Sequence, residues 1–116
     1  MVLINLTLAV ICFGSNMECH PILYGDKTPK GEFTMVVRVT PQVGYGGDVI
    51  QFHADDKQIY AIHRLWTRSP QQKREERISS PDISRRKISA GCINVMPEVY
   101  EQLKACCVNE PLKVIP

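Results

Sequence analysis

Two residues of the chain have the chemical types needed for nucleophilic catalysis, namely Cys92 and His63. A thiol becomes a strong nucleophile when a base or a positive neighbour favours its thiolate form, and histidine is the usual base. Cys92 follows Gly91, whose missing side chain would let the backbone of another molecule approach the sulfur. His63 ends an apolar run that favours a β-strand, and catalytic residues concentrate at strand ends and in loops. From spacing alone, both a catalytic couple and a structural role for the two residues stay open.

The residues around Cys92 suggest how the thiol would be activated. We expect Cys92 to lie just before a helix over residues 97–107, whose dipole would favour the thiolate. The backbone N–H groups of Gly91 and Cys92 could serve as an oxyanion hole. Ser89 and Asn94, which flank the thiol, can orient groups around it through hydrogen bonds.

The other four cysteines match no zinc-binding pattern, and they are Cys12, Cys19, Cys106 and Cys107. Because the total of five is odd, at least one thiol is unpaired within the chain. We interpret Cys12, Cys106 and Cys107 as small buried core residues. Cys12 and Cys19 could also face each other across a hairpin, which the sequence does not decide. Adjacent cysteines such as Cys106 and Cys107 rarely bridge each other.

The length and composition predict one domain over residues 1–116. With 44% apolar residues and no long polar tract, the chain of 116 residues can bury a core. A formal net charge of +2 is too small to favour nucleic acid as a partner. Half of the 14 basic residues fall within one segment, and they are Arg64, Arg68, Lys73, Arg74, Arg77, Arg85 and Arg86. We interpret this segment as a solvated charged loop rather than as an anion site.

The elements that would position these side chains are mostly strands. Alternation and β-branched residues predict strands over residues 2–13 (with a break near Thr7 or Leu8), 34–39, 49–53, 58–63 and 112–115. Residues 71–77 favour a short helix, and residues 97–107 favour an amphipathic helix with one apolar face. The predicted fold class is therefore mainly β, with one amphipathic helix near the C-terminus and a long charged loop.

The apolar residues 1–14 resemble a signal peptide in composition only. They lack the positive n-region and a clear small-residue cleavage site. The run is also too short to cross a bilayer as a helix. We interpret it as core strand, and we expect the usual export signal to be absent from the chain.

Four short motifs, in order along the chain, resemble those of one enzyme family. Residues 28–33 (TPKGEF) are similar to a TPxGxF segment, and Ile62-His63 resembles an IH element. Residues 89–94 (SAGCIN) resemble a signature of Ser or Thr, any residue, Gly-Cys, a hydrophobic residue and then Arg or Asn. Residues 114–116 resemble the final strand. On these motifs the chain resembles the catalytic domain of L,D-transpeptidases of the YkuD/ErfK type.

This resemblance implies a β-sandwich in which Cys92 is the nucleophile and His63 is the base that activates it. Ser89, through its backbone, would orient the imidazole. In the family, the cysteine attacks the peptide carbonyl between a diamino acid and the terminal D-alanine of a peptidoglycan stem tetrapeptide. D-alanine leaves, and a thioester remains until an amine on a second stem resolves it, which cross-links or remodels the cell wall. The resemblance implies neither a metal nor an organic cofactor.

The resemblance also implies substrate-binding residues. Asn94 occupies a position near the substrate where the family often has Arg or Asn. Ala90 stands where many members have histidine, which would alter the lining of the pocket. Arg64, next to the base, is the third residue that we predict to bind substrate. The interval from His63 to Cys92 is longer than in many members, and its charged stretch 71–86 would serve as a lid or as a contact for the stem peptide.

We therefore predict an L,D-transpeptidase that acts on peptidoglycan stem peptides as a monomer, in the periplasm or cell envelope. An L,D-carboxypeptidase, in which water resolves the thioester, would use the same site. So would a cell-wall-targeting toxin that is delivered to other bacteria. A non-catalytic peptidoglycan-binding module is the alternative from another class, and the intact Cys92, His63 and Ser89 argue against it.

Overall fold

The computed structural model describes residues 1–116, and its first two strands come from the apolar N-terminal stretch. β1 (Val2–Asn5) and β2 (Val10–Phe13) pair antiparallel across a short turn. The predicted break near Thr7 or Leu8 is confirmed. Val2 and Ile4 are fully buried, so the interpretation of this stretch as core strand is also confirmed.

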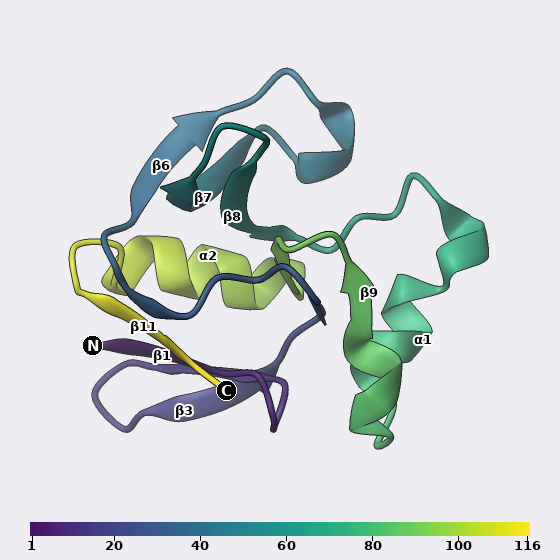
Figure 1. Ribbon diagram of the computed structural model, residues 1–116, viewed down its shortest axis with the longest axis horizontal. Coiled ribbons are helices and arrows are strands. Elements are labelled where there is room, and N and C mark those ends of the chain that lie inside the picture. The colour runs from purple at the N-terminus through teal and green to yellow at the C-terminus, as the bar shows by residue number, and fades with distance from the viewer.

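A five-stranded sheet with the order β3-β2-β1-β11-β5 forms one layer of the molecule. It is completed by β3 (Glu18–Pro21), β5 (Gly31–Phe33) and the predicted closing strand β11 (Leu112–Ile115). β1 and β11 run parallel, with Val2 opposite Leu112. The first and last strands therefore lie side by side within the same sheet (Figure 1).

A four-stranded sheet with the order β10-β8-β7-β6 forms the second layer. Its strands are β6 (Val36–Val39), β7 (Asp48–Ala54), β8 (Ile59–Arg64) and β10 (Ile93–Val95). β7 and β8 form the predicted antiparallel hairpin. β10 runs parallel to β8. Because parallel neighbours cannot be joined by a tight turn, residues 65–92 leave the sheet and return to it as a crossover.

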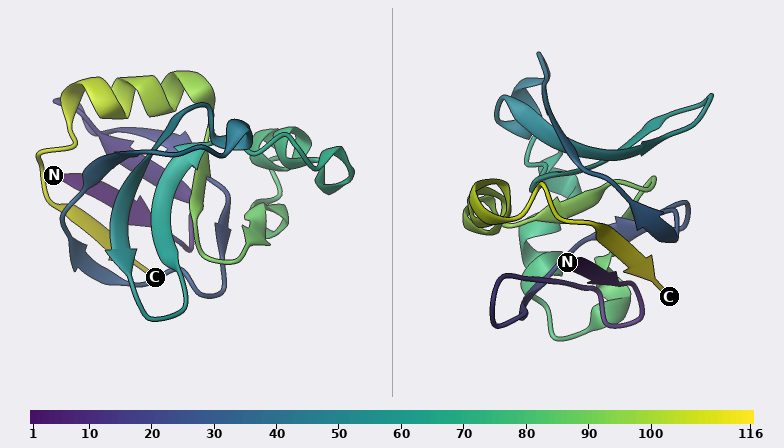
Figure 2. Two further views of the ribbon diagram at one scale, coloured as in Figure 1. Left: turned by 90° about the horizontal axis from the view of Figure 1, so that it is seen from above. Right: turned by 90° about the vertical axis from the view of Figure 1, so that its left-hand side faces the viewer.

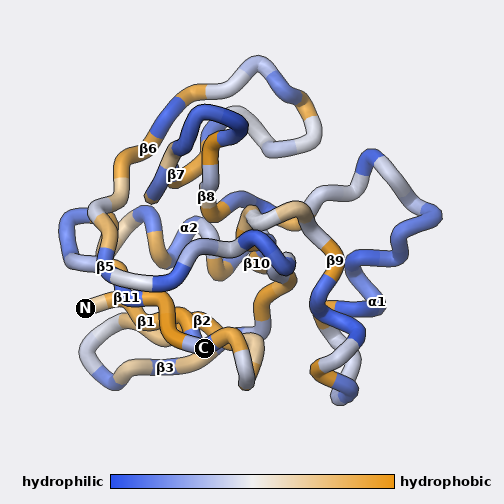
Figure 3. Tube along the Cα trace, in the orientation of Figure 1, coloured by the Kyte–Doolittle hydropathy of each residue, from blue (hydrophilic) through white to orange (hydrophobic).

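The crossover holds half of the 14 basic residues and has its own local structure. It contains the 3-10 helices η2 (Pro70–Gln72) and η3 (Ile83–Arg86) and the helix α1 (Arg74–Ser79), which begins three residues later than predicted. β9 (Lys87–Ser89) then pairs with β4 (Tyr24–Gly25) in a third, two-stranded sheet. Figure 3 shows a largely hydrophilic α1 at the side of the molecule. Its one buried residue, Ile78, packs against Leu23 and Leu65.

The helix α2 (Pro97–Cys106) lies along one open side of the two main sheets (Figure 2). It buries Val99, Tyr100 and Leu103, which share one face of the helix. These residues join a core cluster of 20 residues to which both sheets contribute. The chain is therefore a mainly β sandwich, as predicted. Neither α1 nor α2 is long and apolar enough to span a membrane.

Four of the five cysteines form disulfide bonds. Cys12 and Cys19 lie opposite each other on β2 and β3 and are bridged, which settles the alternative that the sequence left open. Cys106 and Cys107 at the end of α2 are also bridged, contrary to the expectation for adjacent cysteines. Cys107 is buried, but Cys106 is exposed, so the interpretation of Cys106 as a core residue is wrong. Cys92 is the one free thiol of the chain.

Candidate active site

The parallel strands β8 and β10 bring the turn of Cys92 to the strand that carries His63. Asn94 of β10 lies opposite His63 of β8 in the register. Cys92 directly precedes β10, and its sulfur lies 3.7 Å from the carbonyl oxygen of Ile59 on β8, so the turn that carries the thiol lies against the strand of His63. The helix α2 begins only at Pro97, beyond β10, so the prediction that Cys92 directly precedes a helix is wrong.

The imidazole of His63 is held by a backbone carbonyl. Nδ1 lies 2.6 Å from the carbonyl oxygen of Arg64, and the residue is 3% exposed. Because a carbonyl oxygen can only accept a hydrogen bond, Nδ1 carries the proton in the neutral ring and Nε2 keeps its lone pair. The ring also packs on Tyr45, with 4.5 Å between centroids. The carbonyl of Arg64 therefore orients the imidazole, and the role predicted for the Ser89 backbone is not seen.

Burial keeps both reacting groups neutral. The pKa of His63 is lowered to about 4, mainly by burial, with a further contribution from the positive charge of Arg74. The pKa of the Cys92 thiol is raised by burial, although a backbone hydrogen bond from Ala61 and the charge of Arg74 oppose this rise. The thiol donates to the carbonyl oxygen of Ile59, 3.7 Å away, rather than to the imidazole. The site at neutral pH thus holds a thiol and a neutral imidazole, not a thiolate–imidazolium pair.

Ser89 locks the turn that carries Cys92. Its hydroxyl donates to the carbonyl oxygen of Cys92 at 2.6 Å and accepts from the N–H of Gly91 at 3.2 Å. The N–H of Gly91 is therefore engaged within the turn, which contradicts its predicted place in an oxyanion hole. The contribution predicted for the N–H of Cys92 stays a prediction.

Thr28, in the TPKGEF segment, anchors the same turn from a distant part of the chain. Its buried hydroxyl donates to the carbonyl oxygen of Gly91 at 2.9 Å and accepts from the N–H of Gly25 at 3.1 Å. The two segments approach so closely that a Cβ on Gly25 would lie 2.0 Å from the carbonyl oxygen of Ser89. The TPxGxF resemblance pointed to this segment, but no local pattern indicated that Thr28 binds the turn of Cys92.

Gly91 is required by packing inside the chain. A Cβ at this position would lie 2.6 Å from Cε1 of Tyr60, closer than atoms can approach without a shift. The ring of Tyr60 thus occupies the space that we expected another molecule's backbone to use. Ala90, by contrast, is exposed beside the turn, and its contact with substrate stays a prediction.

Asn94 is fully buried and binds the crossover. Its Oδ1 accepts from the backbone N–H of Trp66 at 3.2 Å and from Nη1 of Arg74 at 2.8 Å. Its Nδ2 is buried without a hydrogen-bond partner. Asn94 therefore holds Arg74 beside the two reacting residues. Sequence reasoning missed Arg74, because nothing distinguished it from the other basic residues of its segment.

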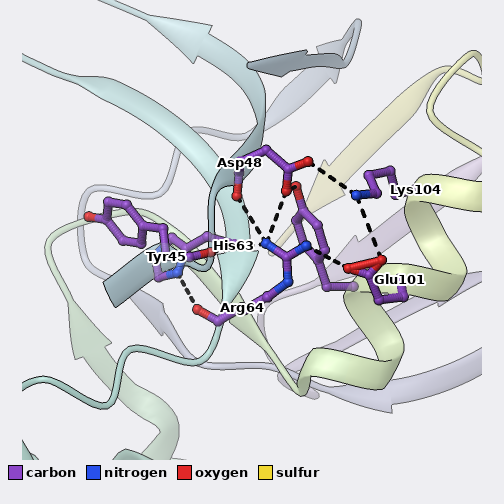
Figure 4. Close-up of polar contacts among 7 residues, drawn as sticks. Tyr45, Asp48, His63, Arg64, Glu101 and Lys104 are labelled. Atoms are coloured by element: carbon purple, nitrogen blue, oxygen red, sulfur yellow. Dashed lines mark hydrogen bonds and ion pairs between the residues drawn. The ribbon is translucent and has the colours of Figure 1, made fainter. Parts of the chain in front are cut away.

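Arg64 lies among charged and aromatic side chains (Figure 4). Its guanidinium packs 4.1 Å from the ring centroid of Tyr100 on α2. It donates to Oδ1 of Asp48 at 2.9 Å and to Oε1 of Glu101 at 2.5 Å. It also donates to the carbonyl oxygen of Tyr45 at 3.0 Å. Through these partners Arg64 fixes the sheet to α2, and its predicted contact with substrate stays a prediction.

Two other arginines of the crossover bind backbone carbonyls rather than solvent. Arg77 donates to the carbonyl oxygens of Gln72 and Arg85. Arg86 donates to those of Ala9 and Ser80. Arg74 and Arg86 thus hold the crossover against the rest of the fold, and Arg77 closes it on itself, so the interpretation of the basic segment as a solvated loop is wrong for these residues. No group of three or more His, Cys, Asp or Glu side chains is placed to hold a metal ion.

Neither a protein-family model nor a curated protein matches the sequence. Solved structures do match the fold. An L,D-transpeptidase from Mycobacterium smegmatis is similar with a TM-score of 0.61 and 17% identity, over 99% of this chain and 58% of that chain. L,D-transpeptidase 3 from Mycobacterium tuberculosis is similar with a TM-score of 0.64 and 12% identity, over 99% of this chain and 60% of that chain.

A second structure of the Mycobacterium tuberculosis enzyme, in complex with a faropenem-derived adduct, has a TM-score of 0.61 and 14% identity, over 99% of this chain and 59% of that chain. The chain thus spans about three fifths of the length of these structures. At such low identities the likeness is one of fold, and it confirms the predicted L,D-transpeptidase type of β-sandwich.

Proposed function

We propose that the protein is a cysteine-dependent acyltransferase of the L,D-transpeptidase kind that acts on peptidoglycan stem peptides. One observation carries the proposal: the free thiol of Cys92 directly precedes β10, and the neutral imidazole of His63 lies on β8, the parallel neighbour of β10. That placement occurs within the fold that the chain shares with L,D-transpeptidases.

In the proposed reaction, the sulfur of Cys92 attacks the carbonyl carbon before the terminal D-alanine of a stem tetrapeptide. The thiol proton passes to Nε2 of His63, because this nitrogen carries the free lone pair of the ring. The imidazolium then protonates the leaving amine, so D-alanine departs and a thioester remains on Cys92. An amine of a second stem gives its proton to His63 as it attacks the thioester, and the free thiol returns.

The two pKa values shape this mechanism. A thiol whose pKa lies above its ordinary value does not give its proton to an imidazole with a pKa of about 4 in the resting enzyme. The proton therefore moves as the sulfur–carbon bond forms, which is general-base catalysis rather than attack by a preformed thiolate. The absence of a thiol–imidazole hydrogen bond suits this reading, because such contacts often tighten only when substrate binds.

We place the protein in the periplasm or cell envelope. Disulfides form and persist in oxidising compartments, and two are present here, Cys12–Cys19 and Cys106–Cys107. Peptidoglycan, the proposed substrate, also lies in the oxidising cell envelope. The substrate and the disulfides therefore support the same location.

The first test is acylation by faropenem, because the Mycobacterium tuberculosis enzyme of the same fold carries an adduct derived from it. We expect intact-mass spectrometry to show one adduct and peptide mapping to place it on Cys92. The variant Cys92→Ala should show none while its circular dichroism spectrum stays unchanged. An unmodified wild-type Cys92 after long incubation, in folded protein, would count against the proposal.

The second test separates transfer from hydrolysis. Purified protein is incubated with disaccharide tetrapeptides, and the products are separated by chromatography and identified by mass. Cross-linked dimers with release of D-alanine would establish transfer to an amine. Tripeptides without dimers would establish an L,D-carboxypeptidase instead, and binding without any product would favour the non-catalytic module.

A further inference from the structure

We propose that Arg74 is the specificity-determining residue of the site, and that it selects acyl donors with a carboxylate beside the reacting carbonyl. The inference rests on the function proposed above and adds to it the part of the substrate that is recognised. Two observations support it: the chain fixes the guanidinium of Arg74 in one orientation, and two nitrogen donors, Nη2 of Arg74 and Nδ2 of Asn94, have no partner.

The guanidinium of Arg74 is held in one orientation by two side chains. Nε donates to Oε1 of Gln72 at 2.8 Å, and Nη1 donates to Oδ1 of Asn94 at 2.8 Å. Both acceptors are neutral amides, so they fix the planar group without cancelling its charge. Asn94 is itself fully buried in β10, which gives the guanidinium a rigid support.

That orientation places the positive charge beside the nucleophile. Asn94, which binds the guanidinium, lies two residues after Cys92 and opposite His63 in the sheet register. The thiol interacts electrostatically with Tyr45, Tyr60 and Arg74, and no carboxylate contributes to the shift in the pKa of Cys92. The charge of Arg74 reaches the thiol, because it opposes the rise that burial causes in the pKa of Cys92.

Two nitrogen donors of this group have no partner within the chain. Nη2 of Arg74 makes no hydrogen bond or ion pair, although Glu75 and Glu76 lie close to it in sequence. Nδ2 of Asn94 is buried without an acceptor. Nη2 is free to bind a ligand at the half-buried guanidinium, and a buried amide donor such as Nδ2 of Asn94 is normally satisfied, so the two donors together indicate a ligand that brings oxygen atoms.

A ligand can reach this guanidinium from solvent. Arg74 is half-buried, and it lines a surface hollow of 290 Å³ together with Trp66, Lys73, Glu75 and Glu76. Glu75 and Glu76 line this hollow with Arg74 and would repel an anion there, whereas the neutral Asn94 binds the guanidinium on the side of β10. The carboxylate should therefore bind on the thiol side of Arg74.

The stem tetrapeptide offers one carboxylate in the required place. The terminal carboxylate belongs to the D-alanine that leaves, and only the α-carbon and the scissile nitrogen separate it from the attacked carbonyl. An Arg74 that binds this group would direct Cys92 to the end of a peptide and away from internal bonds. Arg suits the role better than Lys, because its planar fork can donate two parallel hydrogen bonds to one carboxylate.

The first experiment measures charge selection at the thiol without any peptide. Cys92 is the one free thiol, so alkylation of the oxidised protein reports on it alone. We expect Arg74→Met to lower the rate ratio of anionic iodoacetate to neutral iodoacetamide roughly 10-fold at low salt. Added salt should lower this rate ratio in the wild type, because it screens the charge. Arg74→Lys should retain most of the wild-type ratio, because it keeps the positive charge. Arg68→Met, which removes the same charge from an exposed position of the crossover, is the matched control.

The second experiment uses two stem tetrapeptides that differ only in a free or an amidated C-terminus. We expect the wild type to prefer the free carboxylate at least 10-fold in kcat/KM, and Arg74→Met to lose that preference. If neither peptide is turned over, the proposed function fails, while the alkylation ratio still tests Arg74. An alkylation ratio in folded Arg74→Met and Arg74→Gln equal to that of the wild type would overturn the inference.

Discussion

His63 is almost completely buried and has a free lone pair on Nε2, so it is suited to act as a neutral general base. The ring is neutral across the neutral pH range, because its pKa is lowered to about 4 by burial and by Arg74. We predict that His63→Ala slows acylation of Cys92 by faropenem by roughly 10²–10⁴-fold, as for loss of a general base. Stopped-flow loss of faropenem absorbance measures the rate, and an unchanged rate would remove His63 from the mechanism.

The same burial makes His63 a source of pH-dependent stability. In the unfolded chain its pKa returns to the ordinary 6.5, whereas in the folded chain it is about 4. Between these values the unfolded state binds the extra proton, so stability is lost as the pH falls through this window. We predict that the free energy of unfolding drops by about 2 kcal/mol from about pH 7 to about pH 5 on account of this residue.

Urea unfolding at several pH values measures this loss, and His63→Gln is the control because it cannot titrate. Plotted against pH, the free energies of unfolding of the wild type and the variant should run parallel above about pH 7. Below it the two curves should converge, because only the wild type loses the contribution of His63. His20 and His53 remain in both proteins, so they cancel in the comparison. Curves that stay parallel down to about pH 4 would contradict the prediction.

At the scale of single residues, the sequence pointed to the candidate pair but not to its supports. Cys92 and His63 stood out because their types and neighbours are those of a known site. Arg74 did not, because its role depends on where the crossover returns to the sheet. The helix-dipole prediction failed because Ile93–Val95, a run too short to separate from the helix by periodicity, forms β10.

At the scale of elements, the nucleophile turn is held by a partner 63 residues away in sequence, the hydroxyl of Thr28. We predict that Thr28→Val destabilises the fold by about 1–3 kcal/mol, because it leaves the N–H of Gly25 and the carbonyl oxygen of Gly91 without their partner. We also expect slower acylation of Cys92, since the turn that positions the sulfur loosens.

The control for this prediction is Thr34→Val, the same substitution at an exposed position near β5. Thermal unfolding and the faropenem acylation rate are measured for both variants. The prediction is contradicted if Thr28→Val matches the control in both. If it lowers only stability, Thr28 supports the fold without setting the position of the sulfur.

The limits of sequence reasoning at this scale lie in the crossover. The hairpin of β7 and β8 and the closing strand were predictable, because alternation and flanking turns are local signals. The segment from Arg64 to Arg86 was read as solvated, because arginines and glutamates dominate it. Its order comes from arginines that reach backbone carbonyls far along the chain, such as Arg86 to Ala9, and no local pattern encodes such contacts.

At the scale of the whole molecule, one charged cluster joins the four-stranded sheet to α2. Asp48 at the start of β7 accepts from Arg64 of β8 at 2.9 Å, from Tyr100 at 2.8 Å and from Lys104 at 3.1 Å. The mainly β character was predictable from strand-rich patterning, and the sandwich from the resemblance of four short motifs. This cluster was not, because its members are spread over more than 50 residues and meet only in the folded chain.

Asp48→Asn tests how much this cluster contributes. Although burial raises the pKa of Asp48, hydrogen bonds from Tyr100, Lys104 and Arg64 lower it below its ordinary 3.8 overall. Its stabilising effect is therefore present above that value and is lost as the pH falls below it. Because the side chains of Asp48 and Arg64 are only 20% and 17% exposed, we predict a loss of about 2–3 kcal/mol at neutral pH.

Asp26→Asn is the matched control, because Asp26 pairs with Lys87 while its side chain is 81% exposed. An exposed pair contributes about 0–1 kcal/mol, so this variant should unfold close to the wild type. Urea unfolding of the three proteins should give Asp48→Asn the lowest free energy of unfolding at neutral pH. In acid, where Asp48 of the wild type is protonated, the variant and the wild type should become similar. Equal losses in the two variants would show that α2 is held by its buried apolar face, through Val99, Tyr100 and Leu103, and not by the charged cluster.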